Sequence, residues 1–184
     1  MAKVVVVFHS GYGHTLRMAQ AVANGAGAEL LAIDADGKLP EGGWDVLAAA
    51  DAIIFGSPTY MGNVSWQFKR FADASSKPWY AQAWKDKLAA GFTNSSGLNG
   101  DKQATLGALF TLAMQHSMVW ASQGLMPSST LTSTRQDINN LASYSGAMSQ
   151  SPSGAGADQM LAGDLETGRL FGQRVADLAK RFFG

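Results

Sequence analysis

Apolar runs alternate along the chain with amphipathic segments and with short loops rich in glycine, serine and asparagine. The first run, residues 4–8, consists of four valines and a phenylalanine. A continuous β-branched run of this kind is typical of a strand buried on both faces in the middle of a parallel sheet. It ends at Ser10 in a loop with two glycines, after which apolar residues recur at helical spacing over 16–26.

The same alternation continues to the end of the chain. It predicts further strands at 29–33, 51–56 and 87–93 and the start of a fifth at 118–120, and helices at 44–50, from 62–63 onward, at 103–117 and from a cap at Asp164. Residues 121–163 are rich in Ser, Gly, Ala and Thr, and no element is predicted there. These units predict one α/β domain over 1–184, with a doubly wound five-stranded parallel sheet, three αβα layers and right-handed crossovers.

The segment between the first strand and the first helix has the composition of a phosphate cradle. Its residues are Ser10-Gly11-Tyr12-Gly13-His14-Thr15. Glycines let the backbone approach a ligand closely, and the free N–H groups of a first helical turn attract anions. The hydroxyls of Ser10 and Thr15 add two donors, whereas His14 is expected to contribute its backbone N–H rather than its ring.

Three kinds of phosphate loop can be compared with this segment. A Walker loop needs a lysine, and none lies between Lys3 and Lys38. The dinucleotide fingerprint is met at two glycines but fails at Leu16, although Asp34 stands where a ribose-binding acid is expected, so this interpretation stays open. The third kind surrounds the terminal phosphate of FMN with hydroxyls and N–H groups, without a basic residue, and residues 10–15 fit it.

Ligands of open α/β sheets bind outside the carboxyl ends of the strands, where the strand order reverses. The loops after the third and fourth strands, 57–63 and 93–100, are uncharged there and offer neutral donors. A flat ring with apolar faces and a hydrogen-bonding edge, such as isoalloxazine, suits such loops. Ordinary turns share this composition, but its occurrence at all three positions favours a site.

Composition narrows the function classes. With 46% hydrophobic and 15% charged residues, the 184-residue chain can bury a full core. Its 14 basic and 14 acidic residues balance, which argues against a nucleic-acid or membrane-surface partner. It has no cysteine, so thiolate chemistry and zinc–thiolate sites are excluded. The three histidines have no metal-ligand spacing, and without an apolar span or leader a soluble cytoplasmic protein is expected.

These segments resemble the flavodoxin-like superfamily, and within it the WrbA-type NAD(P)H:quinone oxidoreductases and NADPH-dependent FMN reductases. The matching pieces are residues 10–15, Gly56 to Asn63, Trp79 ahead of 87–89, Asn94 to Asn99, 116–119 and 144–147. The resemblance implies a flavodoxin-like fold and bound FMN. The cofactor-binding residues that it implies are Ser10, Gly11, Tyr12, Gly13, His14, Thr15, Pro58, Thr59, Tyr60, Met61, Gly62, Asn63, Asn94, Ser95, Ser96, Gly97, Leu98, Asn99 and His116.

Further roles follow from the same resemblance. It implies that Tyr12 contacts the nicotinamide nucleotide and that Trp79 lines the substrate pocket. As the catalytic residue, His116 would stabilise reduced flavin at its pyrimidine edge. A histidine near a helix end can instead cap that end, and Trp79 can equally be a core or interface residue.

Three departures from the family pattern limit these inferences. Tyr60 stands where WrbA-type proteins usually carry arginine, and the third loop has fewer glycines than usual. The stretch 35–43 lacks the insertion that helps those enzymes form tetramers. The choice between NADH and NADPH, and between a homodimer and a homotetramer, is therefore left open.

The function expected from the sequence is a hydride relay, in which NADH or NADPH reduces FMN and a quinone or similar acceptor then takes two electrons. The main alternative is a one-electron carrier of the flavodoxin type. Such carriers are usually strongly acidic, and this chain is neutral. A scaffold that has lost its cofactor is a third possibility, against which the intact loops argue. The aromatics Trp66, Trp79, Tyr80 and Trp84 and the low net charge favour at least a homodimer with the site near its interface.

Overall fold

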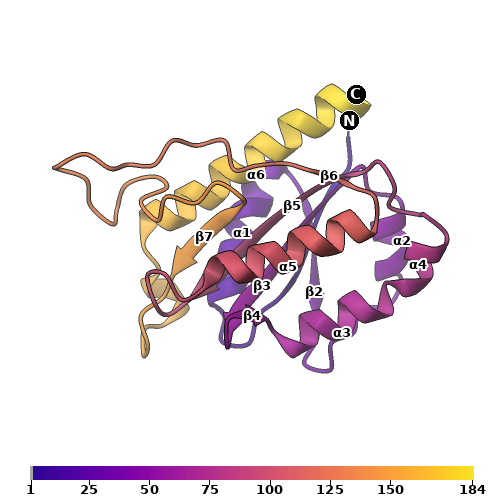
Figure 1. The fold of residues 1–184 in the computed structure, drawn as a ribbon, viewed down its shortest axis with the longest axis horizontal. Helices are drawn as coiled ribbons and strands as arrows, with labels where there is room; N and C mark the ends of the chain where they lie inside the picture. Colours follow the sequence, from indigo (N-terminus) through magenta and orange to yellow (C-terminus); the bar gives the residue numbers. More distant parts are fainter. Residues whose placement is uncertain (1) are drawn as a thin grey trace.

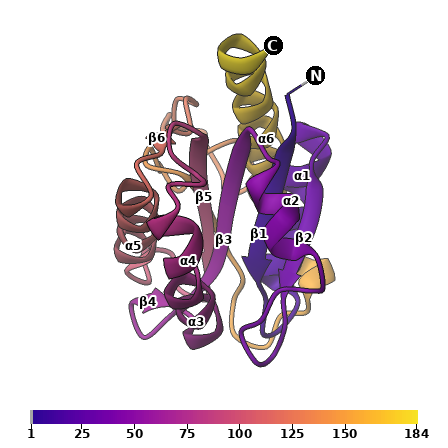
Figure 2. The same cartoon turned by 90° about the vertical axis from the view of Figure 1, so that its right-hand side faces the viewer.

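The computed structural model describes residues 2–184. A parallel sheet with the order β2-β1-β3-β5-β6 lies between two layers of helices, as Figures 1 and 2 show. The flavodoxin-like three-layer fold is therefore confirmed. The strands of this path are β1 (Val4–His9), β2 (Glu29–Ile33), β3 (Ala52–Tyr60), β5 (Leu88–Ser95) and β6 (Val119–Trp120).

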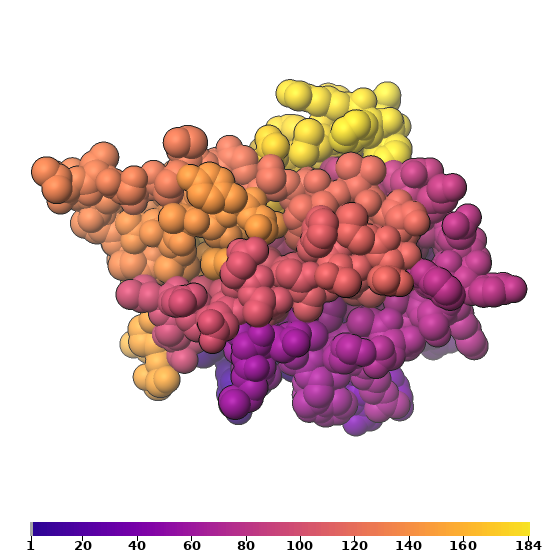
Figure 3. All heavy atoms as spheres, viewed as in Figure 1, coloured from indigo at the N-terminus to yellow at the C-terminus, as the bar shows by residue number. Residues whose placement is uncertain are grey.

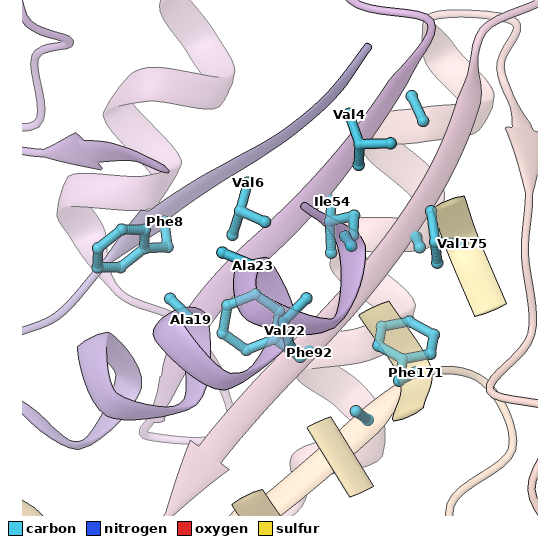
Figure 4. Packing of buried hydrophobic residues seen from close by; sticks show 14 of the residues in the cluster. Val4, Val6, Phe8, Ala19, Val22, Ala23, Ile54, Phe92, Phe171 and Val175 are labelled. Atoms are coloured by element: carbon cyan, nitrogen blue, oxygen red, sulfur yellow. The ribbon is translucent and has the colours of Figure 1, made fainter. Parts of the chain in front are cut away.

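The two faces of β1 enter two different cores. Val4, Val6 and Phe8 pack toward α1 (His14–Ala26) and α6 (Ala162–Phe183), as Figure 4 shows. Val5 and Val7 face the opposite layer, which is formed by α2 (Gly43–Ala48), α3 (Trp66–Ala74) and α5 (Lys102–Gln115). Burial on both faces explains the unbroken apolar run.

The fifth strand is split into two pieces. β6 pairs with the start of β5 in the register Leu88↔Val119, and β7 (Ala147–Gln150) pairs with its end in the register Phe92↔Ala147. Residues 121–146 leave the sheet between these pieces and stand out at one end of the molecule (Figures 1 and 3). The sequence did not predict β7, because its segment Ala-Met-Ser-Gln has no strand periodicity.

The third strand is longer than predicted, and the helix after it begins later. β3 continues to Tyr60 and turns through Met61 and Gly62, both at positive φ, into the short antiparallel strand β4 (Asn63–Val64). Such a two-residue turn matches the twist of a hairpin. The predicted helix start at 62–63 is therefore wrong, and α3 begins at Trp66.

Two further helix predictions differ from the structure. Asp164 does not cap α6, which begins two residues earlier. Its carboxylate instead accepts hydrogen bonds from Arg135 and from the backbone N–H of Gln150. The structure also contains the unpredicted short helices α4 (Ser76–Tyr80) and η1 (Ala157–Gln159). None of the helices described combines the length and the apolarity needed to cross a membrane.

Candidate cofactor site

A pocket of about 590 Å³ lies at the carboxyl edge of the sheet, where β1, β3, β5 and β7 end. The loops that follow these strands gather at the lower end of the molecule in Figure 2. β1 lies between β2 and β3, so the strand order reverses at this place, as expected for a ligand site. The pocket is lined by Tyr12, His14, Thr15, Pro58, Thr59, Tyr60, Asn94, Ser95, Ser96 and residues 151–156.

The loop 10–13 is shaped by the hydroxyl of Ser10. Its Oγ accepts hydrogen bonds from the N–H of Gly13 at 3.2 Å and from the N–H of Leu16 at 3.0 Å. A hydroxyl that accepts two bonds still has its own proton to donate. Gly13 adopts φ 89°, a conformation that glycine reaches without strain. The loop therefore keeps a donor available while it holds its own shape.

The remaining N–H groups of this loop are free to bind an anion. Within residues 2–184, the N–H groups of Gly11, Tyr12, His14 and Thr15 have no hydrogen-bond partner. They lie at the amino end of α1, where the helix dipole favours negative charge. Four N–H donors and the Ser10 hydroxyl suit the doubly charged terminal phosphate of FMN.

The imidazole ring of His14 also takes part in the site, in addition to its backbone N–H. Its Nε2 donates to the carbonyl oxygen of Ala155 at 2.8 Å, because a carbonyl can only accept. The imidazole thereby joins the cradle to the loop 151–156, which forms another wall of the pocket. Neither this ring contact nor the loop 151–156 was predicted from the sequence. The loop would have been placed at this edge if 147–150 had been identified as a strand.

Asn94 presents a fixed amide donor. Its Oδ1 accepts from the hydroxyls of Ser149 at 2.9 Å and of Ser151 at 3.0 Å. This arrangement leaves the Nδ2 group without a partner among the described residues. The side chain is buried and lines the pocket. An amide held in this way can donate to an acceptor on the edge of a flavin ring.

Thr59 differs from Asn94, because its hydroxyl is hydrogen-bonded to two other threonines of the protein. It donates to Thr105 Oγ1 at 2.8 Å and shares a hydrogen bond of 2.8 Å with Thr93 Oγ1. Since Thr59 already donates to Thr105, the Thr93 hydroxyl donates to Thr59. The Thr59 hydroxyl therefore has no proton left to donate to a ligand.

Two tyrosines stand at the mouth of the pocket. The rings of Tyr12 and Tyr60 meet edge to face, with 6.3 Å between their centroids. Tyr12 is 80% exposed and Tyr60 38%. Burial raises the pKa of Tyr60, and Tyr12 raises it further. Tyr60 is therefore neutral at physiological pH, and its ring adds an aromatic surface at the mouth of the pocket.

Several residues of the predicted set lie outside this pocket. Met61 and Gly62 form the tip of the hairpin, and the Asn63 side chain accepts from the N–H of Val64. Leu98 and Asn99 line a neighbouring cavity of about 550 Å³. Gly97 lines neither cavity. Ser10, Gly11 and Gly13 do not line the pocket either, although they shape the turn between β1 and α1. The structure thus brings together Tyr12, His14 and Thr15 of the cradle, residues 58–60 and residues 94–96.

His116 lies far from the other predicted residues of the same chain. α5 starts beside the carboxyl end of β5 and runs back, so that His116 precedes β6, which pairs with the first residues of β5. His116 therefore lies at the amino edge of the sheet, opposite the pocket. The expectation that it reaches the flavin of its own chain does not agree with this topology.

The environment of His116 also opposes a cationic role. The Ser75 hydroxyl donates to the carbonyl of Ala72, so His116 Nε2 donates to Ser75 Oγ at 2.9 Å. The ring packs on Trp84 at a centroid distance of 4.1 Å. Burial lowers the pKa of His116 to about 4, and the imidazole is neutral at pH 7. These contacts are those of a core residue.

Trp79 lies with His116 in a larger apolar groove. This groove of about 1190 Å³ is bounded by α3, α4 and α5, and it reaches Tyr60 at its other end. Trp79 is about half exposed, whereas Trp84 is completely buried. Trp84 therefore cannot serve as an interface aromatic. Trp66, Trp79 and Tyr80 remain on the surface.

Comparison with known proteins identifies the family of this chain. Residues 45–130 match the family "NADPH-dependent FMN reductase". Flavodoxin FldP of Pseudomonas aeruginosa is 54% identical over 98% of both chains, and an NAD(P)H dehydrogenase (quinone) of Syntrophobacter fumaroxidans is 33% identical, covering 97% of this chain and 98% of the other. The chain belongs to the flavodoxin-like, FMN-binding family. The family resemblance drawn from the sequence is thereby confirmed.

Solved structures of the family extend this comparison. The flavodoxin, WrbA-like protein from Agrobacterium tumefaciens has a TM-score of 0.83 and 54% identity, covering 98% of this chain and 99% of that one. A flavodoxin from the domain Archaea has a TM-score of 0.60 at 18% identity over 97% and 99% of the two chains, and it shows the fold alone. Of the two relatives matched in sequence, one is named a flavodoxin and the other an NAD(P)H dehydrogenase (quinone).

Proposed function

We propose that the protein is an FMN-dependent oxidoreductase that transfers hydride from NAD(P)H to a quinone or a similar two-electron acceptor. The observation that carries this proposal is the distribution of aromatic rings around the pocket. Tyr12 and Tyr60 stand together, and the loops 94–96 and 151–156 contribute no aromatic side chain. Hydride passes between rings that lie face to face, so one face of the flavin has to stay uncovered, whereas single electrons can pass through an exposed edge.

Different residues of the chain would bind the phosphate and the ring of such a cofactor. The cradle N–H groups and the Ser10 hydroxyl would hold its phosphate, and Asn94 Nδ2 would donate to its ring. The tyrosines would exclude water on one side. When bound, FMN supplies the hydride chemistry itself. The protein therefore needs no nucleophile, in agreement with its lack of cysteine.

Two further observations support an enzyme. The relative from Syntrophobacter fumaroxidans is named an NAD(P)H dehydrogenase (quinone). The chain has 14 basic and 14 acidic residues. A carrier that docks on many partners usually depends on a strong net charge, and this chain lacks one.

A one-electron carrier is the second candidate. It is favoured by the name of the 54% identical relative, which is a flavodoxin. The same pocket would serve a carrier, because the cradle and Asn94 bind the cofactor whichever partner delivers the electrons. The two candidates therefore differ in what reduces the bound cofactor.

Anaerobic mixing of the FMN-loaded protein with NADH or NADPH separates them. An enzyme is bleached within seconds by at least one nicotinamide and regains its colour when a soluble quinone is added. Free FMN at the same concentration is the control for the uncatalysed reaction. A protein that dithionite bleaches, but that neither nicotinamide reduces faster than free FMN, is a carrier, and the proposal is then wrong.

We also propose that the protein assembles as a homodimer or a larger closed oligomer through the aromatic groove. Trp66, Trp79 and Tyr80 are 58%, 48% and 86% exposed around it. The zero formal charge does little to keep copies apart. Sedimentation velocity at micromolar concentration tests this proposal, and Trp66→Ala combined with Trp79→Ala should shift the species toward monomer. A wild-type monomer at those concentrations would contradict it.

A further inference from the structure

Lys102 is the first residue of α5, and its side chain is completely buried. Burial of a cation is costly, and the amino end of a helix repels positive charge. Lysine is therefore disfavoured at this position on two grounds. A buried ammonium group needs hydrogen-bond acceptors, and all three acceptors of Lys102 belong to the loop 95–98.

The ammonium group is saturated by three oxygens of the loop 95–98. Nζ donates to Ser95 Oγ at 2.9 Å, to the carbonyl of Gly97 at 2.6 Å and to the carbonyl of Leu98 at 2.9 Å. An ammonium has three protons, so each has one acceptor. Among the described residues no carboxylate lies within ion-pair distance of it. The loop is thus wrapped around the cation.

The backbone after the loop is built to close around this group. Gly100 adopts φ 55°, and a Cβ there would collide with Ser95 Oγ. Asp101 follows in the left-handed region as well, with φ 52°. Two consecutive residues in this conformation reverse the direction of the chain, so that the Lys102 side chain can contact residues 95–98.

The inward carbonyls determine where the loop presents its donors. In a trans peptide the N–H points opposite to the carbonyl. Because the carbonyls of Gly97 and Leu98 face Lys102, the N–H groups of Leu98 and Asn99 face away from it. Within residues 2–184 neither N–H has a partner. Lys102 therefore leaves free donors on the outer side of this loop, where Leu98 and Asn99 line the neighbouring cavity of about 550 Å³.

The loop 95–98 forms part of the cofactor pocket and is hydrogen-bonded to residues 150–151, which lead into the pocket segment 151–156. Ser95 and Ser96 line the pocket. The Ser95 carbonyl accepts from the N–H of Ser151 at 3.0 Å, and the Ser96 carbonyl accepts from Gln150 Nε2 at 2.7 Å. A change in the shape of the loop 95–98 would therefore also move residues 150–151, which follow β7.

We propose that Lys102 is a positioning residue for the cofactor, which holds the loop 95–99 in its binding shape and places a buried positive charge behind it. This inference rests on the FMN site of the proposed function. Reduced flavin carries more negative charge than oxidised flavin, so a cation behind the pocket favours the reduced form. Lys102 thereby acts both on affinity and on potential.

Two charged groups face Lys102 from the neighbouring elements. Asp164 of α6 favours its charged form, and Arg135, which pairs with Asp164 at 2.7 Å, opposes it. Burial is the largest influence and lowers the pKa of Lys102 to about 8. The ammonium is therefore present at pH 7 and is lost above pH 8, within a range where binding can be measured.

Lys102→Met tests the inference, because methionine fills a similar volume and donates no hydrogen bond. Titration of the apoprotein with FMN and with riboflavin should show at least tenfold weaker binding of both flavins. Lys85→Met, a change at an exposed lysine, is the matched control and should bind both like wild type. Wild-type affinity in Lys102→Met would overturn the proposal.

Two readouts separate positioning from a purely structural role. The potential of bound FMN should be more negative in Lys102→Met by about 30 mV for each tenfold loss of preference for the reduced form. Wild-type affinity for riboflavin, which has no phosphate to titrate, should fall as the pH rises from 7 to 9, while that of Lys102→Met stays level. A wild-type affinity that is constant over this range contradicts the proposal even if the variant does not fold.

The role of Lys102 can be tested even if the proposed enzymatic function is wrong. The binding titrations require no nicotinamide, so they remain informative if the protein proves to be a carrier. A wild-type protein that binds neither flavin would instead refute the cofactor site itself.

Discussion

The cradle at 10–15 and the loop at 95–102 each contribute residues to the cofactor pocket, Tyr12, His14 and Thr15 from the first and Ser95 and Ser96 from the second, but they are stabilised in different ways. The cradle contains no charged residue, and the turn within it is shaped by hydrogen bonds between close neighbours, such as Ser10 with Gly13, although the His14 ring also bonds the distant Ala155. The loop 95–102 surrounds a buried cation and is tied to residues more than fifty positions away. A binding site for an anion can thus be made from backbone N–H groups and a hydroxyl, without a cation, whereas the second loop is held by a buried lysine.

The largest effect is expected from removal of both cradle hydroxyls. Ser10→Ala with Thr15→Ala should weaken FMN binding by about 3–6 kcal/mol, because a hydrogen bond from each hydroxyl to the charged phosphate would be worth about 1.5–3 kcal/mol. Loss of Ser10 Oγ also leaves the N–H groups of Gly13 and Leu16 unpaired. Fluorescence titration measures the change. Riboflavin, which has no phosphate, should bind nearly as before, and unaltered FMN affinity would place the phosphate elsewhere.

His116 belongs to neither region, and its effect should appear in stability. Its pKa is lowered to about 4 by burial, while the unfolded chain titrates near 6.5. As the pH falls from 6.5 to 4, only the unfolded state takes up this proton, so stability is lost over that window, by about 3 kcal/mol at pH 4. Urea unfolding from pH 7 to pH 4 should show this loss.

The matched variant for His116 is His116→Asn, which cannot titrate there. It should lose less stability than wild type on acidification, although His9, whose pKa burial also lowers, still contributes. The potential of bound FMN should equal that of wild type. A shifted potential would return His116 to the cofactor site, which a neighbouring subunit would then have to complete.

Asn94 offers a finer test of the pocket. Asn94→Asp keeps an oxygen for the hydroxyls of Ser149 and Ser151 but replaces the free Nδ2 donor with an acceptor. Loss of one hydrogen bond, with an acceptor left facing the ring, should cost about 1–3 kcal/mol in binding of both FMN and riboflavin. Asn94→Leu is the companion variant and tests loss of the donor without added charge. Equal affinity in all three proteins would show that the amide does not contact the ring.

The difference between the cradle and the loop 95–102 also explains which parts of the fold and the site could be predicted from the sequence. β1, the cradle and α1 follow from contiguous patterns, so their positions were correct. β7, the loop 151–156 and Lys102 were missed, because each is defined by partners distant in the chain, such as Ser95 for Ser151. A lysine at the start of an otherwise uncharged helix was the one local signal of the buried cation. His116 was placed by family position alone, and the direction of α5 separates it from the pocket.

The smallest effect is expected at Trp79, where the groove and the pocket can be compared directly. Trp79 lines the groove with His116 but not the cofactor pocket. Trp79→Ala should therefore change FMN affinity less than twofold, because no contact with the pocket is lost. If copies assemble through the groove, the same variant should raise the KM for quinone without changing the affinity for FMN. Parallel fluorescence titration and steady-state assays measure the two quantities, and an FMN affinity that falls tenfold would show that the groove and the pocket act as one site.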